Sequence, residues 1–178
     1  MKYLITGIAG LLGSRLADWI VENTDNEVIG VDDLSGGYIE NVNPKVKFYK
    51  FDLVDLNEVE GIFKKEQPDI VYHFAAYAAE GLSPFIRKYN YDNNLITSTN
   101  LITCSIQYNI SRFVFASSMS VYGDKYKPPF DENLKQAPID PYAVAKYAVE
   151  MDLEIAFKQH GLNYTIVRPH NFLSLIHI

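Results

Sequence analysis

The chain has 178 residues, of which 48% are hydrophobic and 21% are charged, a balance that predicts one globular domain with a sizeable core. A net charge of −6 without a basic cluster argues against nucleic acid or an anionic membrane as a partner. The single cysteine, Cys104, allows neither an internal disulfide nor a metal cluster, so we expect no metal site and a cytoplasmic setting. No run approaches the roughly 18 apolar residues of a membrane span, and the N-terminal MKYLITG predicts a buried strand rather than a signal peptide.

Strands and helices alternate along the chain. Apolar runs closed by turn residues predict strands, and apolar residues at helical spacing predict helices. The expected strands are Lys2–Thr6, Glu27–Val31, Val46–Phe51, Ile70–Phe74, Arg112–Ala116 and Tyr164–Val167. The expected helices are Leu11–Asn23, Asp55–Lys65, Ile86–Tyr108 and Pro141–His160, with a Pro-rich loop at Lys125–Asp140. This order predicts an α/β domain with a doubly wound parallel sheet and helices on both faces.

The first strand-to-helix turn, TGIAGLLG, carries Gly7, Gly10 and Gly13. Glycine is needed where the backbone turns with positive φ, approaches a pyrophosphate, or lets helix and strand touch. Asp32 ends the second strand, about 20 residues further on, where a carboxylate accepts ribose hydroxyls and repels a 2′-phosphate. The pattern predicts a dinucleotide site that prefers NAD to NADP. The alternative is a glycine-rich turn without a ligand, followed by a turn-starting aspartate.

Tyr142 and Lys146 are four residues apart and share one face of a predicted helix. An ammonium group beside a phenol is expected to lower the tyrosine pKa from about 10, so that the tyrosine can exchange a proton with a sugar hydroxyl. Ser118 follows the fifth strand, at the edge of the sheet where ligands bind, and can polarise the same oxygen. The alternative for the Tyr–Lys pair alone is a simple helix-surface pair.

Together these landmarks resemble the extended short-chain dehydrogenase/reductases, the NAD-dependent epimerase/dehydratase group. The resemblance runs from TGIAGLLG to Asn171 through VDDLSGG, FDLVD, HFAAYAA, YDNN, FASSMSVYG, PYAVAK and VRPHN, and it implies a Rossmann fold with bound NAD. The residues implied to bind the cofactor are Gly7, Gly10, Leu11, Leu12, Gly13, Asp32, Asp33, Ser35, Asp52, Leu53, Phe74, Ala75, Ala76, Asn93, Tyr142, Lys146 and His170. The implied catalytic residues are Ser118, Tyr142 and Lys146, and substrate contacts are implied for Ser118, Tyr142 and Asn171.

Within this resemblance, some positions have a more specific expected role. Asp52 and Leu53 are expected at the adenine edge, and Asn93 is expected to brace the loops around the cofactor. His73, at the end of the fourth strand, is expected to be a packed core histidine rather than a base.

The resemblance also bears on the reaction. Dehydratases of the family carry an Asp-Glu pair directly after the serine of the fifth strand, where this chain has Met119 and Ser120. We therefore expect a nucleotide-sugar epimerase, acting on a UDP-sugar. Tyr142 would take a proton from the C4 hydroxyl, NAD would take the hydride, and the ketose would turn over and be reduced on its other face. The alternatives are a net oxidoreductase or dehydratase, and a non-catalytic NAD-binding relative.

After VRPHN the family continues with V-Y-G-P and a smaller substrate domain, whereas this chain reads FLSLIHI. We expect residues 1–171 to form the cofactor-binding domain, and residues 172–178, with His177, to be a non-family tail after a truncation. Such a fragment is expected to be inactive and, with one face exposed, poorly soluble. The two long helices correspond to a dimer interface in the family, so a homodimer is expected through outward residues such as Ile96, Leu101, Tyr147 and Met151; simple packing onto the sheet is the alternative.

Overall fold

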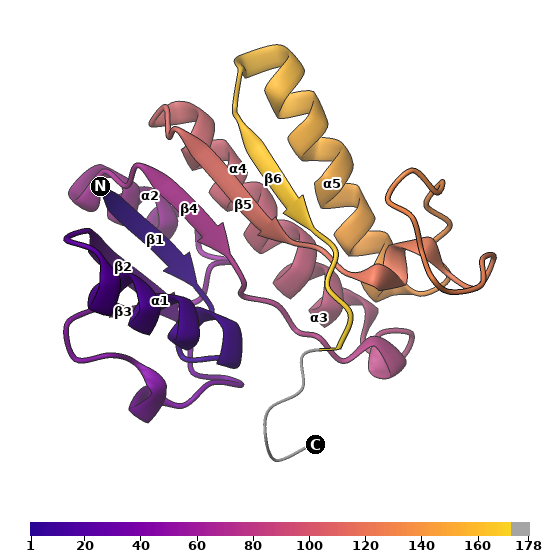
Figure 1. The fold of residues 1–178 in the computed structure, drawn as a ribbon, viewed down its shortest axis with the longest axis horizontal. Helices are drawn as coiled ribbons and strands as arrows, with labels where there is room; N and C mark the ends of the chain where they lie inside the picture. The colour runs from indigo at the N-terminus through magenta and orange to yellow at the C-terminus, as the bar shows by residue number, and fades with distance from the viewer. Residues whose placement is uncertain (172–178) are drawn as a thin grey trace.

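Within residues 1–171, six strands form one parallel sheet, whose arrangement Figure 1 shows. They are β1 (Lys2–Thr6), β2 (Glu27–Asp32), β3 (Lys47–Lys50), β4 (Ile70–His73), β5 (Arg112–Ala116) and β6 (Tyr164–Val167). The spatial order is β3-β2-β1-β4-β5-β6, and all neighbouring pairs are parallel. The computed structural model describes residues 1–171, so the predicted tail and His177 lie outside the described residues. The reversal of strand order between β1 and β4 confirms the predicted doubly wound Rossmann sheet.

Helices lie on both faces of this sheet (Figure 1). On one face, α1 (Leu11–Asn23) packs against β1 and β2. The other face carries three adjacent helices, α2 (Leu56–Glu66), α4 (Thr97–Gln107) and α5 (Pro141–His160). The shorter elements are η1 (Ile39–Asn41), η2 (Glu80–Leu82), α3 (Arg87–Tyr91), η3 (Asp92–Ile96) and η4 (Met119–Tyr122). None of the described helices has the length and apolar character needed to cross a bilayer.

The ends of α2 and α5 follow from their capping residues. The carboxylate of Asp55 accepts a hydrogen bond from the N–H of Asn57, and that of Asp140 accepts one from the N–H of Ala143, each at 2.9 Å. These caps satisfy N–H groups that have no partner inside the helix. Gly161 ends α5 with a φ of 73°, a left-handed conformation that glycine adopts without strain. The predicted bounds of α5 are confirmed, whereas Asp55 is the cap of α2 and not its first helical residue.

The predicted helix 86–108 is a helical segment with an irregular centre. Between α3 and α4, η3 follows the wider π-helical hydrogen-bonding pattern. A π-helical turn accommodates an extra residue and rotates the side chains that follow it. This turn lies beside the candidate site described below.

Two hydrophobic clusters fill the two sides of the sheet. In the larger one, Leu4, Val71 and Phe113 of the sheet pack against α2, α4 and α5, and each is at most 1% exposed. Leu101 belongs to this cluster and is 1% exposed, so the expectation that it points outward was wrong. Each such side chain stabilises the fold by about 1.5–3 kcal/mol. The smaller cluster packs α1 onto β1 and β2 through Ile5, Ile8, Ala17, Ile20, Val28 and Val46.

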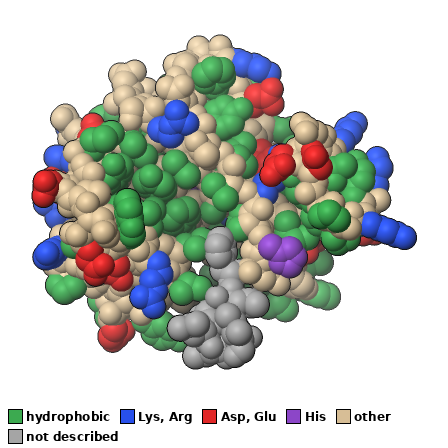
Figure 2. Space-filling model, viewed as in Figure 1, with side chains coloured by type: hydrophobic (Ala, Val, Ile, Leu, Met, Phe, Trp, Pro, Cys, Tyr) green, Lys and Arg blue, Asp and Glu red, His purple; other side chains and the backbone are tan. Residues whose placement is uncertain are grey.

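Hydrophobic side chains also gather on the face of the sheet seen in Figure 2. Tyr72 lies between Tyr3 and Phe74, with ring centroids 6.0 Å away on each side, and Val167 of β6 is 45% exposed. Among residues 1–171, no helix covers β4, β5 and β6 on this side. We call this surface the open sheet face.

Candidate functional site

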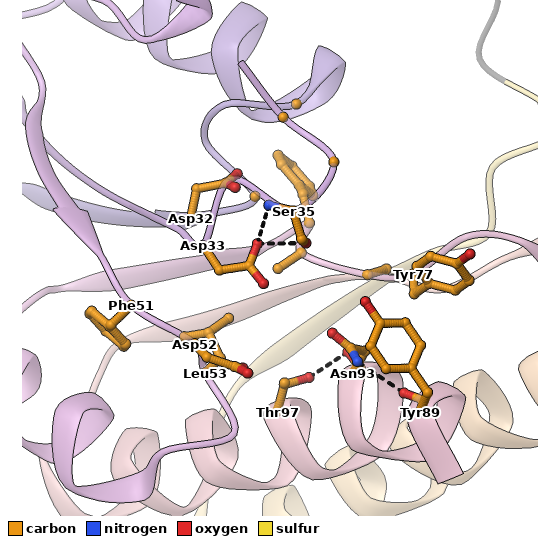
Figure 3. Close-up of a pocket in the computed structure, with 17 residues that line it drawn as sticks. Asp32, Asp33, Ser35, Phe51, Asp52, Leu53, Tyr77, Tyr89, Asn93 and Thr97 are labelled. Atoms are coloured by element: carbon orange, nitrogen blue, oxygen red, sulfur yellow. Dashed lines mark hydrogen bonds between the residues drawn. The ribbon is translucent and has the colours of Figure 1, made fainter. Parts of the chain in front are cut away.

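Two adjacent pockets lie at the carboxyl ends of the strands, where doubly wound sheets bind their ligands. The glycine-loop pocket (Figure 3) is lined by Gly7, Gly10, Asp32, Asp33, Ser35, Gly36, Gly37, Phe51, Asp52, Leu53, Phe74, Ala75, Ala76, Tyr77, Tyr89, Asn93 and Thr97. The tyrosine pocket is lined by Leu12, Phe74, Ala76, Ala78, Glu80, residues 116–120, Gly123, Ile139, Tyr142, Lys146, Pro169, His170 and Asn171. Phe74 and Ala76 line both pockets, which are therefore neighbours.

The turn between β1 and α1 has no room for a side chain at two of its glycines. Gly7 has a φ of 69°, and a Cβ there would lie 2.7 Å from the backbone nitrogen of Ala75. A Cβ at Gly13 would overlap the carbonyl oxygen of Gly7, so Gly13 lets α1 approach β1 and lines neither pocket. Gly10 caps α1 without a side-chain hydrogen bond. The N–H groups of the first turn therefore have no side-chain cap, which suits an anion such as a pyrophosphate.

The two leucines after Gly10 point to different surroundings. Leu12 lines the tyrosine pocket. Leu11 is 45% exposed and lies on the outer side of the turn, next to the loop that contains η1. Leu11 is thus the one predicted cofactor residue, besides Gly13, that the structure places outside both pockets.

Asp32 and Asp33 form an acidic wall of the glycine-loop pocket (Figure 3). Asp32 accepts hydrogen bonds from the N–H groups of Ala9, at 3.0 Å, and Leu34, at 2.8 Å, so it fastens the glycine turn to the end of β2. Asp33 accepts bonds from the N–H and the hydroxyl of Ser35, at 2.8 and 2.7 Å. Carboxylates in this position suit ribose hydroxyls and disfavour a phosphate.

Another wall of this pocket follows β3 and consists of Phe51, Asp52 and Leu53. Asp52 accepts a hydrogen bond from the N–H of Val54, at 2.9 Å. The carbonyl of Leu53 accepts one from the side chain of Asn100 on α4, also at 2.9 Å. The loop after β3 is thus tied to α4, which packs beside α2 on the same face of the sheet.

Asn94 makes the bracing contacts that were expected of Asn93. Its Oδ1 accepts a hydrogen bond from the N–H of Tyr77 at 3.0 Å, and its Nδ2 donates one to the carbonyl of Tyr77 at 3.1 Å. Asn93 lines the pocket and donates a bond to the carbonyl of Tyr89 at 2.9 Å (Figure 3). The two asparagines are adjacent in the sequence, and the π-helical turn directs the second one, which is 1% exposed, into the protein.

Ser118, Tyr142 and Lys146 meet in the tyrosine pocket. Tyr142 and Lys146 are 7% and 2% exposed, and Nζ of Lys146 lies 5.7 Å from the centre of the Tyr142 ring. Lys146 donates a hydrogen bond to the carbonyl of Ala116 at 2.9 Å. The hydroxyl of Ser118 accepts a bond from the N–H of Ser120 at 3.1 Å. The structure thus brings the three predicted catalytic side chains together.

The acid–base properties of this pair differ from the expectation. Burial raises the pKa of Tyr142, while the nearby hydroxyl of Ser118 acts in the opposite direction and the carboxylates of Glu80 and Asp140 raise it further. Burial lowers the pKa of Lys146 to about 7. The expected lowering of the tyrosine pKa by the lysine was therefore wrong for the protein alone, because the low-dielectric site disfavours the charged form of both groups.

The tyrosine pocket also contains residues whose role the sequence did not indicate. Glu80 reaches it from η2, and the pKa of its carboxyl is raised by burial and by Asp140. The buried hydroxyl of Ser120 has no hydrogen-bonding partner among the described residues. The predicted pair His170 and Asn171 lines the same pocket, where the N–H of Asn171 donates to Nδ1 of His170 at 2.8 Å.

His73 is a packed core residue, as predicted. It is 1% exposed, and its ring nitrogens lie 2.7 Å from the hydroxyl of Thr6 and 2.9 Å from that of Ser98. Burial lowers its pKa to about 3, so it is neutral at physiological pH. Within residues 1–171, no group of three or more His, Cys, Asp or Glu side chains is arranged to hold a metal ion.

Comparison with known proteins agrees with this geometry. Residues 3–175 match the NAD dependent epimerase/dehydratase family. The chain belongs to this family. UDP-glucose 4-epimerase of Lactobacillus helveticus is 36% identical over 171 residues, which cover 96% of this chain and 52% of that family member.

Two solved structures of the family are also similar. UDP-glucose 4-epimerase of Thermotoga maritima, solved with UDP-glucose, matches with a TM-score of 0.91 and 38% identity over 94% of this chain and 55% of that one. UDP-glucose 4-epimerase of Thermus thermophilus, in complex with NAD, matches with a TM-score of 0.88 and 32% identity over 94% and 54%. The chain thus spans about half the length of these family members.

Proposed function

We propose that this chain is the NAD-binding and catalytic half of a nucleotide-sugar 4-epimerase that acts on a UDP-sugar. The observation that carries the proposal is the meeting of Ser118, Tyr142 and Lys146 in a pocket that adjoins the glycine-loop pocket. Support comes from the family, whose members named above are UDP-glucose 4-epimerases, one solved with UDP-glucose and one with NAD.

NAD fits the residues of the two pockets. Gly7 and Gly10, with the uncapped first turn of α1, would hold the pyrophosphate. The wall of Asp32 and Asp33 would hold the adenosine ribose and favour NAD over NADP. Because the pockets share Phe74 and Ala76, one extended ligand can reach from this wall to Lys146. When bound, NAD accepts a hydride from the sugar and returns it.

The chain's own side chains would move the proton at the C4 hydroxyl. Tyr142 is placed to exchange this proton, and Ser118 to hydrogen-bond the same oxygen. Lys146, whose pKa is about 7, is half protonated near neutral pH, and its ammonium form stabilises a phenolate. Burial makes the charge states of both groups sensitive to any charge that a ligand brings into the pocket.

The residues after Ser118 favour epimerisation over dehydration. Met119 and Ser120 begin η4 where dehydratases of the family carry an acid pair. Glu80 enters the same pocket from η2, and its raised pKa makes it able to protonate a leaving hydroxyl. This glutamate makes a dehydratase the second candidate, which a 4-keto-6-deoxy product would distinguish.

Turnover is proposed to need residues beyond this chain, because the curated and solved relatives are about twice as long. The open sheet face would also limit the solubility of the chain by itself.

A homodimer through α4 and α5 is proposed as well. Val144, Met151 and Ile155 on α5, and Ile96 at the end of η3 just before α4, are 41–48% exposed, and such apolar surfaces often mark interfaces. Tyr147 is half-buried beside them.

The test compares the 178-residue chain with a protein continued past Asn171 from the same source DNA. Each is purified, denatured and assayed for released NAD, and fresh protein is incubated with UDP-glucose, UDP-N-acetylglucosamine and UDP-glucuronate. Formation of C4 epimers without net NADH, abolished by Tyr142→Phe, is the expected result for the longer protein. Net NADH would point to an oxidoreductase. Absence of NAD from both proteins would contradict the cofactor, and equal turnover by the short chain would contradict the need for further residues.

A further inference from the structure

Lys146 and Glu150 lie one turn apart on α5 and do not pair with each other. Lysine and glutamate at this spacing are neighbours on a helix and attract one another. Both side chains are buried, at 2% and 5% exposure, where an unpaired charge is costly. Within residues 1–171, the ion pair of Glu150 is with Arg168, and Lys146 forms none. Lys146 donates instead to the carbonyl of Ala116.

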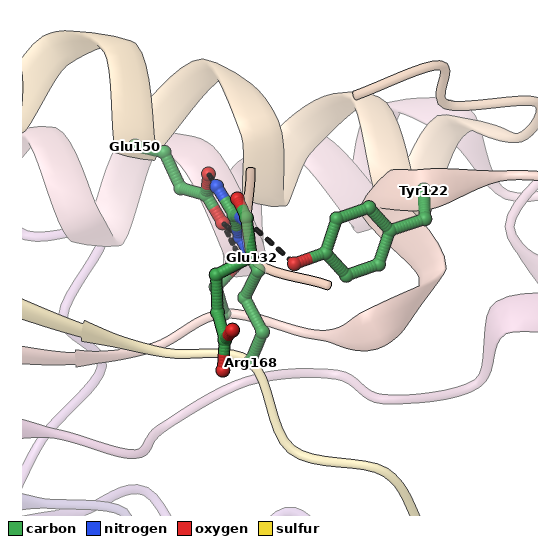
Figure 4. A network of polar contacts seen from close by, with 5 residues as sticks. Tyr122, Glu132, Glu150 and Arg168 are labelled. Carbon is green, nitrogen blue, oxygen red and sulfur yellow. Dashed lines mark hydrogen bonds and ion pairs between the residues drawn. The ribbon is translucent and has the colours of Figure 1, made fainter. Parts of the chain in front are cut away.

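Arg168 directly follows β6 and forms a bidentate ion pair with the carboxylate of Glu150 (Figure 4). Its Nε donates to Oε1 at 3.0 Å and its Nη2 donates to Oε2 at 2.7 Å. The hydroxyl of Ser117 donates a further hydrogen bond to Oε1. Two parallel charge-assisted bonds of this kind are strong and fix the orientation of both groups.

The guanidinium of Arg168 also contacts Tyr122 and the backbone of Glu132. It lies 5.1 Å from the centre of the Tyr122 ring, and Nη1 donates to the hydroxyl of Tyr122 at 2.8 Å and to the carbonyl of Glu132 at 3.3 Å (Figure 4). An arginine combines stacking with forked hydrogen bonding in a way that lysine does not. Arg168 is therefore fixed by Glu150 and Tyr122, and it lines a separate pocket beside Tyr122 and not the tyrosine pocket.

We propose that Arg168 is a positioning residue that keeps Glu150 from pairing with Lys146, and thereby leaves the amine of Lys146 available to the tyrosine pocket. Without Arg168, the buried carboxylate of Glu150 would lack a cationic partner, and Lys146 is the cation one turn away on the same helix. The importance of this arrangement for catalysis rests on the proposed function, in which Lys146 is a catalytic residue. Tyr142, Glu80 and His170 line the tyrosine pocket with Lys146, and the charge of Lys146 acts on His73. Glu150 lies one turn away on α5, and Arg168 is in contact with Glu150.

The test follows the protonation of Lys146 in the 178-residue chain by NMR of its Cε group, assigned with a Lys146→Arg variant. The wild-type midpoint is expected at a pKa of about 7. In Arg168→Met, pairing with Glu150 is expected to raise the midpoint to about 9 or higher. Lys158, whose partner Glu154 is exposed, serves as the internal control and should titrate alike in every variant.

The double variant Arg168→Met/Glu150→Gln separates this role from simple loss of structure. The amide that Glu150→Gln introduces still accepts a hydrogen bond from Ser117 but has no charge, so the midpoint of Lys146 should return to about 7. In parallel, calorimetry should show NAD binding weakened about tenfold or more in Arg168→Met, as for the loss of a charge-assisted hydrogen bond, and recovered in the double variant. A purely structural role predicts that the double variant is at least as impaired as the single one.

Arg168→Gln replaces Arg168→Met if circular dichroism shows that the latter does not fold, because an amide fills part of the space without neutralising the carboxylate. A folded Arg168→Met or Arg168→Gln protein with the Lys146 midpoint still at about 7 would overturn the inference. A raised midpoint without NAD binding in any protein would support the role of Arg168 and contradict the proposed cofactor, so the two failures are distinguishable.

Discussion

Oδ2 of Asp32 accepts a hydrogen bond from the backbone N–H of Ala9 at 3.0 Å, across 23 residues of sequence. Its Oδ1 accepts one from the N–H of Leu34. The side chain is 8% exposed, so it is both a wall of the glycine-loop pocket and the fastener of the glycine turn. Fold stability and the shape of the glycine-loop pocket are therefore linked at this residue.

Asp32→Asn is expected to lower the free energy of unfolding by about 1–3 kcal/mol, because an amide cannot accept both hydrogen bonds and leaves a buried N–H without a partner. Urea unfolding measures this change. Asp33→Asn is the matched control, since the contacts of Asp33 are local and exposed, and it should change stability by less than about 0.5 kcal/mol. Equal stability of the two variants would refute the fastening role of Asp32.

Gly13→Ala is expected to destabilise the chain by about 3 kcal/mol or more, because its Cβ would overlap the carbonyl oxygen of Gly7. Gly61→Ala is the control with the opposite sign. It lies inside α2 with no atom within 4 Å of the added carbon, so alanine should stabilise the helix by about 0.5–1 kcal/mol. Thermal unfolding measures both changes. A lower melting temperature for Gly13→Ala together with a higher one for Gly61→Ala would show that the clash at Gly13, and not the loss of glycine flexibility, causes the destabilisation.

The free energy of unfolding should depend on pH through the protonation of Lys146. Its pKa is about 7 in the folded chain against an ordinary value of 10.5, so between these pH values the unfolded chain holds a proton that the folded chain lacks. The free energy of unfolding should rise with pH across this window by at most about 1.4 kcal/mol per pH unit. Lys146→Met should therefore gain stability relative to wild type at pH 6, and the gain should shrink toward pH 10. An unchanged difference from pH 6 to pH 10 would contradict the lowered pKa; the exposed Lys158→Met is the control.

Assembly should depend on the outer surface of α5. In the proposed homodimer, Met151→Lys combined with Ile155→Lys places charges at two exposed apolar positions and should give a monomer by light scattering. Trp19→Lys, at a 57% exposed position on α1 on the opposite side of the sheet, should leave the mass unchanged. A wild-type chain that is monomeric throughout would show that these helices do not suffice for dimerisation.

The regular part of the fold was predictable because local signals agree with it. Asp140 and Gly161 mark the two ends of α5, and the apolar runs before Gly7 and Asp32 mark two parallel strands. These signals act through neighbouring residues and need no knowledge of the tertiary structure.

The remaining features depend on contacts that a sequence does not display. The π-helical turn changes which of two adjacent asparagines points inward, so Asn94 takes the contacts expected of Asn93. The burial of Leu101 depends on the rotation of α4 on the sheet. The pKa of Tyr142 follows from depth in the protein and not from its spacing to Lys146.

The double attachment of Asp32 also restricts how the cofactor preference of this protein could change, in evolution or by design. In the proposed NAD site, acceptance of NADP requires less negative charge at the acidic wall, yet loss of Asp32 would release the glycine turn that is proposed to hold the pyrophosphate. Among residues 1–171, the hydrogen bonds of the Asp33 and Ser35 side chains join only these two residues, so they can vary without loosening that turn. We therefore expect that substitutions of Asp33 and Ser35 can shift the cofactor preference toward NADP, whereas substitution of Asp32 would also destabilise the glycine turn.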